Sequence, residues 1–129
     1  MVATKKEPRK VLLVEDDILI SDILARKFSQ SGVRVYQALS GKRAFELLKE
    51  ITPDAILLDL VLPEMGGFEI LTRLKKDAKL SKIPVIILSN SSEPSDIEKA
   101  KSLGALDYFV KIDVPLEDVV VRLNSICGA

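Results

Sequence analysis

Four short apolar runs in this sequence each end in side chains that can do chemistry. The clearest is the run 55–58, which ends at Asp59 and is followed by Pro63 and by Gly66-Gly67. The other three end at Glu15-Asp16 after 11–14, at Ser89 after 85–88 and at Lys111 after 108–110. The chain therefore places carboxylates, a hydroxyl and an ammonium at the ends of segments that have the composition of buried strands.

The placement of these groups predicts a single site. Continuous apolar runs of this length are typical of parallel strands that are covered by helices on both faces. In an open parallel sheet, ligands bind in the crevice outside the carboxyl ends of the strands. If the four runs belong to one such sheet, their terminal acid, hydroxyl and ammonium groups are aimed at the same place.

Three carboxylates in one site favour a bound cation. Glu15, Asp16 and Asp59 would repel one another within a few Å, and at least one pKa would rise, unless a cation neutralised them. Mg²⁺ takes oxygen ligands, keeps several waters and binds through one or two carboxylates plus a phosphate. Zinc is disfavoured because the chain has no histidine and only one cysteine, Cys127. We expect Mg²⁺ as the cofactor.

The same set of groups suits phosphoryl transfer, which needs an in-line nucleophile and stabilisation of charge on the equatorial oxygens. Asp59 is the candidate nucleophile, because carboxylates form acyl phosphates in aspartyl-phosphate enzymes. Mg²⁺ would neutralise one phosphoryl oxygen, the Lys111 ammonium a second and the Ser89 hydroxyl the third. Every oxygen of the phosphoryl group then has a partner.

Each residue also has a structural interpretation. Acids such as Asp17 favour a helix N-terminus, and for Asp17 we prefer that interpretation. Taken alone, Ser89 is more typical of a turn, Lys111 of a solvated surface and Tyr108 of packing. The coincidence of polar groups at four strand ends is what favours a functional site.

The composition predicts one domain in a reducing compartment. With 129 residues the chain has the usual size of a single domain, and its 19 basic and 19 acidic residues give none of the positive bias of a nucleic-acid binder. The single cysteine excludes an internal disulfide, and no apolar stretch is long enough for a signal peptide or a membrane span. We expect a cytoplasmic protein with a flexible tail at 1–9 and a domain at 10–127.

Strand-like and helix-like segments alternate along the whole chain, which predicts an α/β fold. The segment 33–37 alternates apolar and polar residues, and 107–111 is short with charged ends, so both belong at the edges of the sheet. The predicted architecture is a doubly wound, five-stranded parallel sheet of order 2-1-3-4-5, that is, a flavodoxin-like (βα)5 fold.

The expected helices lie between these strands. The patterns predict helices at 18–31 with Gly32 as a stop, at 41–50, at 68–77, from 95 to a stop at Gly104, and from Pro115 to about 126. The fourth has the clearest predicted start, because Ser95-Asp96-Ile97-Glu98 has the pattern of a capping box.

The sequence resembles the receiver domain of response regulators, the chemotaxis-regulator-like proteins of two-component signalling, over residues 10–126. Individually the matching stretches are common, but together they are highly specific. They are 11–17 (Val-Leu-Leu-Val-Glu-Asp-Asp), 57–59 with Pro63 and Gly67, 84–89 (Pro-Val-Ile-Ile-Leu-Ser) and 104–111 (Gly-Ala-Leu-Asp-Tyr-Phe-Val-Lys).

The resemblance implies a role for each residue of the site. Asp59 would accept a phosphoryl group from a histidine kinase or a phosphotransfer protein. Asp16 and Asp59 would ligate Mg²⁺ directly, Glu15 through a water and Val61 through its backbone carbonyl.

The resemblance also implies a switch and an output surface. Ser89 and Tyr108 would change position on phosphorylation, and the surface of helix 4, strand 5 and helix 5 would then dock an effector or a second copy of the chain. Such a switch is not an enzyme acting on external substrates, because it catalyses only its own aspartyl phosphorylation and dephosphorylation. In physical terms this is a population shift between two packings.

Three positions differ from the commoner pattern of the family. Ile112 follows Lys111 where a proline with a cis peptide bond is usual. A cis bond before isoleucine costs about 2.5–4 kcal/mol, so we predict a trans bond and a rearranged loop at 112–114. Gly66 replaces a small polar residue, which loosens the loop after Asp59. Asn90 replaces alanine or glycine, which narrows access to the phosphoryl group.

Three other functions compete with a phosphorylated switch. Haloacid-dehalogenase-type phosphatases use a second aspartate two residues after the nucleophile, where this chain has Val61. A receiver-like interaction module that works without phosphorylation is compatible with Ile112 and Gly66, although the intact acid, hydroxyl and lysine set argues against it. A flavin or nucleotide binder is disfavoured because no glycine-rich phosphate loop follows the first run.

Overall fold

The computed structural model describes residues 8–127, and five strands of this range form one sheet. The strands are β1 (Lys10–Val14), β2 (Arg34–Ala38), β3 (Ala55–Leu58), β4 (Val85–Ser89) and β5 (Asp107–Val110). All neighbouring strands are parallel, and their order is β2-β1-β3-β4-β5. The predicted flavodoxin-like fold and the edge positions of β2 and β5 are confirmed.

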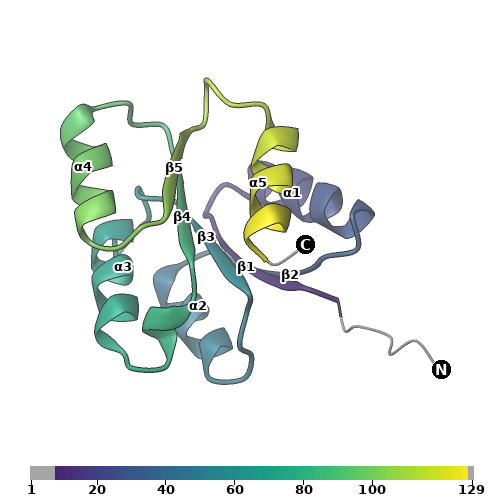
Figure 1. Ribbon diagram of the computed structural model, residues 1–129, viewed down its shortest axis with the longest axis horizontal. Helices are drawn as coiled ribbons and strands as arrows, with labels where there is room; N and C mark the ends of the chain where they lie inside the picture. Colours follow the sequence, from purple (N-terminus) through teal and green to yellow (C-terminus); the bar gives the residue numbers. More distant parts are fainter. Residues whose placement is uncertain (1–7, 128–129) are drawn as a thin grey trace.

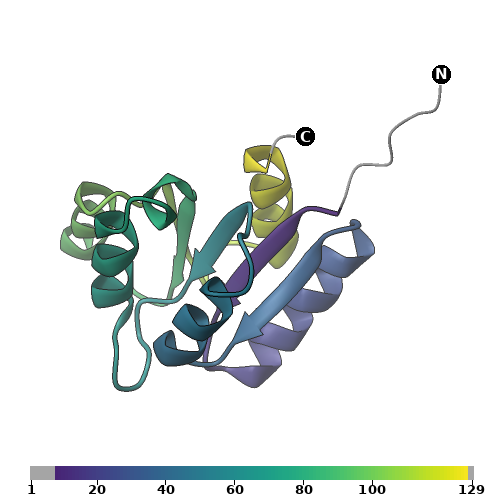
Figure 2. The ribbon, with the colours of Figure 1, turned by 90° about the horizontal axis from the view of Figure 1, so that it is seen from below.

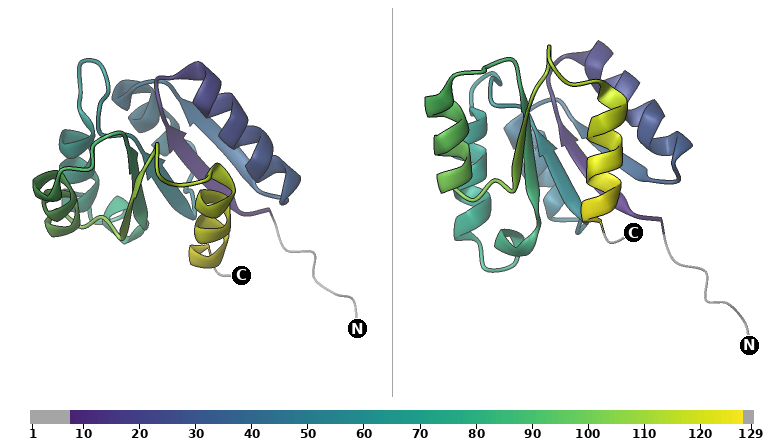
Figure 3. Two further views of the ribbon diagram at one scale, coloured as in Figure 1. Left: turned by 90° about the horizontal axis from the view of Figure 1, so that it is seen from above. Right: turned by 45° about the horizontal axis from the view of Figure 1, so that its top comes forward.

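The register of the central strands brings their carboxyl ends to the same edge of the sheet. Val14 of β1 pairs with Leu58 of β3, Leu58 pairs with Ile87 of β4, and Ser89 of β4 pairs with Val110 of β5. The β4–α4 and β5–α5 connections therefore lie at one end of the sheet, at the top of Figure 1, and they come forward in the right-hand view of Figure 3.

Helices cover both faces of the sheet, as Figures 1 and 2 show. One face carries α1 (Ile18–Gln30) and α5 (Leu116–Ile126), and the other carries α2 (Gly41–Leu48), α3 (Gly67–Lys76) and α4 (Pro94–Ser102). A short 3₁₀ turn, η1 (Leu80–Lys82), links α3 to β4. Within the described residues no helix has the length and apolar character needed to span a membrane.

Successive residues of each central strand contribute to two different cores, because side chains alternate between the faces of a strand. In β1, Leu12 and Val14 pack in the core beneath α2, α3 and α4, whereas Val11 and Leu13 pack in the core beneath α1 and α5. These four side chains are at most 1% exposed. Burial on both faces explains why the run reads as continuously apolar.

The helix ends agree with the predicted ends within one or two residues, and the exception is the predicted cap of α4. Gly32 follows α1 with a φ of +82°, the left-handed conformation that glycine adopts without strain, so it ends the helix as predicted. Asp17 caps α1, with Oδ1 accepting hydrogen bonds from the amides of Leu19 and Ile20. Pro115 directly precedes the first helical residue of α5.

The predicted capping box at Ser95 and Glu98 is wrong. Helix α4 begins at Pro94, its N-cap is Glu93, and no side chain caps it. Proline fits the first helical position because its fixed φ suits the helix and its missing N–H would have no partner there. Ser95 therefore lies inside the first turn, two residues after the cap position.

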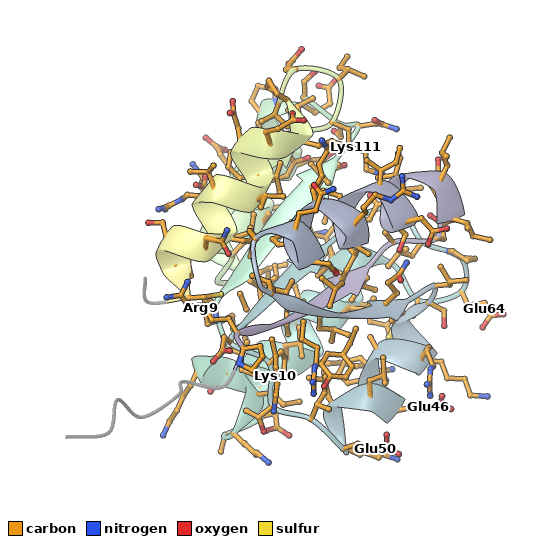
Figure 4. All side chains as sticks on the ribbon, turned by 90° about the vertical axis from the view of Figure 1, so that its right-hand side faces the viewer. Arg9, Lys10, Glu46, Glu50, Glu64 and Lys111 are labelled. Carbon is orange, nitrogen blue, oxygen red and sulfur yellow. The ribbon has the colours of Figure 1, made fainter. Side chains whose placement is uncertain are left out.

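The predicted tail falls almost entirely outside the described residues. Residues 1–7 lie outside them, and the Arg9 carbonyl already accepts a hydrogen bond of 2.8 Å from the Arg34 amide. In Figure 4, Lys10 at the start of β1 and Lys111 after β5 lie at opposite ends of the molecule. The candidate site is at the Lys111 end.

Candidate functional site

Three carboxylates gather at the carboxyl ends of β1 and β3. One oxygen from each of Glu15, Asp16 and Asp59 lies within 4.8 Å of the others. Glu15 and Asp59 are buried, with 1% and 5% exposure, whereas Asp16 is exposed. The site thus has a buried floor and one solvent-facing acid.

The acids line a hollow of about 400 Å³ that opens to solvent. Its lining residues are Glu15, Asp16, Asp17, Asp59, Val61, Asn90 and Lys111. Of the residues predicted to act on a phosphoryl group, Asp59 and Lys111 line this hollow. Ser89 is fully buried, and its neighbour Asn90 lines the hollow in its place.

Lys111 reaches into the carboxylate cluster from β5. Its Nζ lies 2.6 Å from Oε1 of Glu15 and 3.2 Å from Oδ2 of Asp59. Burial lowers the pKa of Lys111, but the contact with Glu15 and the negative charges of both acids outweigh it, so the pKa is raised above its usual 10.5. The lysine is therefore a cation in the site.

The loop after Lys111 is compatible with this reach. The Lys111–Ile112 peptide bond is trans, as predicted from the absence of proline. The amides of Asp113 and Val114 both donate to the Val110 carbonyl, at 3.0 and 3.1 Å, which closes the chain into a tight turn. Ile112 is 82% exposed on this turn, and Lys111 still points at Asp59.

Glu15 is a buried acid of the cluster with a raised pKa. Burial raises the pKa of Glu15 from its usual 4.5 to about 7, against the opposing effects of Lys111 and of the Asp17 amide, which donates to Oε2 at 3.1 Å. The Asp59 charge also contributes to this rise. Oε1 is buried and has the Lys111 ion pair, but it accepts no well-aligned hydrogen bond from the described residues.

Asp59 is fixed by the backbone around it. Its amide donates to the Val14 carbonyl at 3.0 Å, and its Oδ1 accepts from the Val61 amide at 3.3 Å. A Cβ at Gly67 would lie 2.4 Å from the Asp59 carbonyl oxygen and 2.5 Å from the Cα of Leu60. Only glycine permits this approach, so the start of α3 packs directly on the backbone of the acid.

The two predicted switch residues, Ser89 and Tyr108, both form hydrogen bonds with Ser91, a residue that was not predicted to belong to the site. The Ser91 amide donates to the Ser89 hydroxyl at 3.1 Å, and the Tyr108 hydroxyl donates to the Ser91 carbonyl at 2.8 Å. A serine in a loop is too common for composition to single it out. Only the geometry shows that Ser91 touches both.

The donor set fits a hard divalent cation. All of its ligand groups are oxygens, which Mg²⁺ prefers, and three acids share the site with one lysine. Three carboxylates share one ammonium, so the ionised cluster has more negative charge than Lys111 alone neutralises. A cation would relieve this excess.

The fold and the site together define a class of signalling proteins. The structure is similar to chemotaxis protein CheY4 of Vibrio cholerae, with a TM-score of 0.85 and 25% identity over 92% of this chain and 98% of that one. The model of the response regulator receiver domain matches residues 11–123. The chain belongs to this family, whose members act as signalling switches in two-component systems.

Two further relatives illustrate the range of the family. The DNA-binding dual master transcriptional regulator RpaA of Synechocystis is 32% identical over 91% of this chain, which spans about half, 48%, of RpaA. The response regulator Rcp1, known in a Mn(2+)-bound form, is 28% identical over 92% of this chain and 91% of its own, with a TM-score of 0.79.

Proposed function

We propose that this chain is a phosphoacceptor switch in which Asp59 receives a phosphoryl group from a phosphohistidine of a histidine kinase or a phosphotransfer protein. The observation that carries the proposal is the position of the Asp59 carboxylate. It is buried, 3.2 Å from the Lys111 ammonium, and within 4.8 Å of two further acids that line the same open hollow.

The transfer needs little covalent chemistry from the protein. An oxygen of Asp59 attacks phosphorus while the bond between phosphorus and the donor imidazole nitrogen breaks, and the departing imidazole takes its proton from water. Lys111 pairs with a phosphoryl oxygen, which costs no large movement because its Nζ already contacts Asp59. In the acyl phosphate formed on Asp59, the negative charge of the phosphoryl group stays beside the Lys111 ammonium.

Glu15, Asp16, Asp59 and the Val61 carbonyl would hold Mg²⁺. When bound, Mg²⁺ supplies neutralisation of the acids and of the incoming phosphoryl group. The Mn(2+)-bound form of Rcp1 supports a divalent cation in a protein of this family. In this chain the acids would orient the cation, and the exposed Asp16 would provide its entry from solvent.

Ser89 and Tyr108 would transmit the modification to the surface of α4, β5 and α5. Ser89 is fully buried at the end of β4, and Tyr108 on β5 is bonded to the loop that follows Ser89. Contacts with the phosphoryl group that exist in only one of two packings shift the population toward that packing. The altered surface would then dock an effector or a second copy of the chain.

The direct test is intact-mass analysis after incubation with acetyl phosphate and Mg²⁺. One phosphoryl addition is expected in the wild type, and none in the Asp59→Asn variant or with a chelator. Asp113→Asn is a matched control, because Asp113 is exposed on the turn after β5. A wild type that binds Mg²⁺ but stays unmodified overturns the proposal and favours an interaction module that works without phosphorylation.

A further inference from the structure

The hydroxyl of Ser89 is oriented by its own loop. Ser89 is fully buried, and its Oγ accepts a hydrogen bond of 3.1 Å from the Ser91 amide. A serine hydroxyl has one hydrogen and two lone pairs. Because the amide occupies one lone pair, the rotation of the hydroxyl is restricted and its hydrogen stays available for donation elsewhere.

The Ser91 amide is in turn held through the rest of that residue. The Ser91 hydroxyl donates to Oδ2 of Asp96 at 2.5 Å and accepts from the Glu93 amide at 3.3 Å. The Ser91 carbonyl accepts from the Tyr108 hydroxyl at 2.8 Å. Ser91 therefore makes four hydrogen bonds, and three of them fix the loop that presents its amide to Ser89.

Asp96 connects this loop to helix α4. It lies in the first turn of the helix, where the partial positive charge of the N-terminus favours a carboxylate. A hydrogen bond to a charged acceptor is stronger than one between neutral groups. The Ser91–Asp96 bond thus ties the start of α4 to the loop, in a helix that has no side-chain cap.

We propose that Ser91 is a positioning residue for the phosphoryl transfer. Its side chain holds the loop so that the Ser91 amide directs the buried Ser89 hydroxyl to donate toward the phosphoryl group on Asp59. This inference rests on the proposed function of Asp59. It goes further by assigning a role to a residue outside the acid, hydroxyl and lysine set, and by making Asp96 its anchor.

The first test compares Ser91→Ala with Ser92→Ala, because Ser92 is exposed on the same loop and makes no hydrogen bond to the described residues of the site. Loss of the hydroxyl is expected to slow phosphorylation by acetyl phosphate and Mg²⁺ by about three- to tenfold, the scale of one or two hydrogen bonds. Ser91→Thr keeps the hydroxyl and is expected to restore the rate. Ser92→Ala is expected to match the wild type.

A double-mutant cycle separates positioning from a general structural effect. If Ser91 acts through Ser89, then Ser91→Ala changes the rate by less than about 1.5-fold in a Ser89→Ala background. An equal slowing in both backgrounds overturns the proposal. The urea midpoints of all variants are measured in parallel, so that a loss of folded protein is not mistaken for a loss of rate.

A spectroscopic readout tests the loop without phosphorylation. In a Tyr36→Phe background Tyr108 is the only tyrosine, and the chain has no tryptophan. Ser91→Ala is expected to change Tyr108 emission because its carbonyl acceptor moves, whereas Ser91→Thr and Ser92→Ala leave it unchanged. Unchanged rate and emission in Ser91→Ala, with a phosphorylated wild type, overturn this proposal alone. A wild type without phosphoryl addition overturns the proposed function first, and the role of Ser91 with it.

Discussion

The Nζ of Lys111 lies closer to Oε1 of Glu15, at 2.6 Å, than to Oδ2 of Asp59, at 3.2 Å. The lysine is thus shared between two buried acids, of which one is the proposed acceptor. An arriving phosphoryl group would compete with Glu15 for this ammonium.

Replacement of Lys111 by methionine should slow the phosphorylation of Asp59 by about 100-fold, the usual cost of removing one group that stabilises developing charge. The rate of mass gain with acetyl phosphate and Mg²⁺ measures this loss. Lys101→Met is the matched control, because Lys101 is an exposed residue of α4. A Lys111→Met rate within twofold of the wild type contradicts the role given to the ammonium.

The raised pKa of Glu15 predicts a pH dependence of stability in the metal-free protein. The folded state keeps the Glu15 proton up to about pH 7, whereas the unfolded state loses it near 4.5. Between these values the folded state binds more protons, so the free energy of unfolding contributed by this group falls as the pH rises. Urea unfolding with a chelator, at steps from pH 4.5 to 7.5, measures the slope.

Glu15→Gln is the control for that slope, because the amide does not titrate. The difference between wild type and variant isolates the contribution of Glu15 from that of the other acids. The variant is expected to gain stability relative to the wild type toward pH 7. A difference that stays constant over the whole range contradicts a raised pKa for Glu15.

Addition of Mg²⁺ should stabilise the folded chain at pH 7.5. A free concentration of ten times Kd adds about 1.4 kcal/mol if the ion binds only the folded state. The thermal unfolding midpoint with and without EDTA measures this effect. Asp16→Asn should remove most of it, and an equal upward shift of the midpoint in that variant would indicate that Mg²⁺ binds elsewhere.

Replacement of Gly67 by alanine should destabilise the fold by about 2 kcal/mol or more, because its Cβ would overlap the Asp59 carbonyl and the Cα of Leu60, which are backbone atoms that cannot move aside cheaply. Gly66→Ala is the control. Its Cβ would meet only the Leu60 carbonyl oxygen, at an ordinary 3.7 Å. Urea unfolding compares the two, and similar losses of stability would contradict the steric explanation.

Much of the fold could be predicted from hydrophobic pattern alone. The run 55–58 is apolar because β3 is covered on both faces, and β2 alternates because it lies at an edge. Helix α4 shows where local pattern fails. Two sequence features mark possible starts for this helix, a proline at 94 and the pattern of a capping box from Ser95. The helix begins at the proline, because the fixed φ of proline suits the first helical position.

The site could be predicted only in its outline. Asp59 and Lys111 were predictable as members of one site because the carboxyl ends of parallel strands lie at the same edge of the sheet, and the two side chains are 3.2 Å apart. The orientation of Lys111 toward Asp59 depends on the turn at 112–114, and the sequence does not specify the geometry of that turn. The proposed role of Ser91 depends on its amide, carbonyl and hydroxyl together. Backbone groups are the same in every residue, and a loop serine is common, so the sequence does not reveal this role.

The buried side chains on the two faces of the sheet form two separate cores, one beneath α1 and α5 and the other beneath α2, α3 and α4. Leu24 of α1 and Leu71 of α3, for example, belong to different cores. A destabilising substitution in the core beneath α1 and α5 is therefore best compensated by a second substitution in the same core. The proposed output surface takes α4 and Tyr108 from one core and α5 from the other, so each of its two helices can change with the packing of its own core.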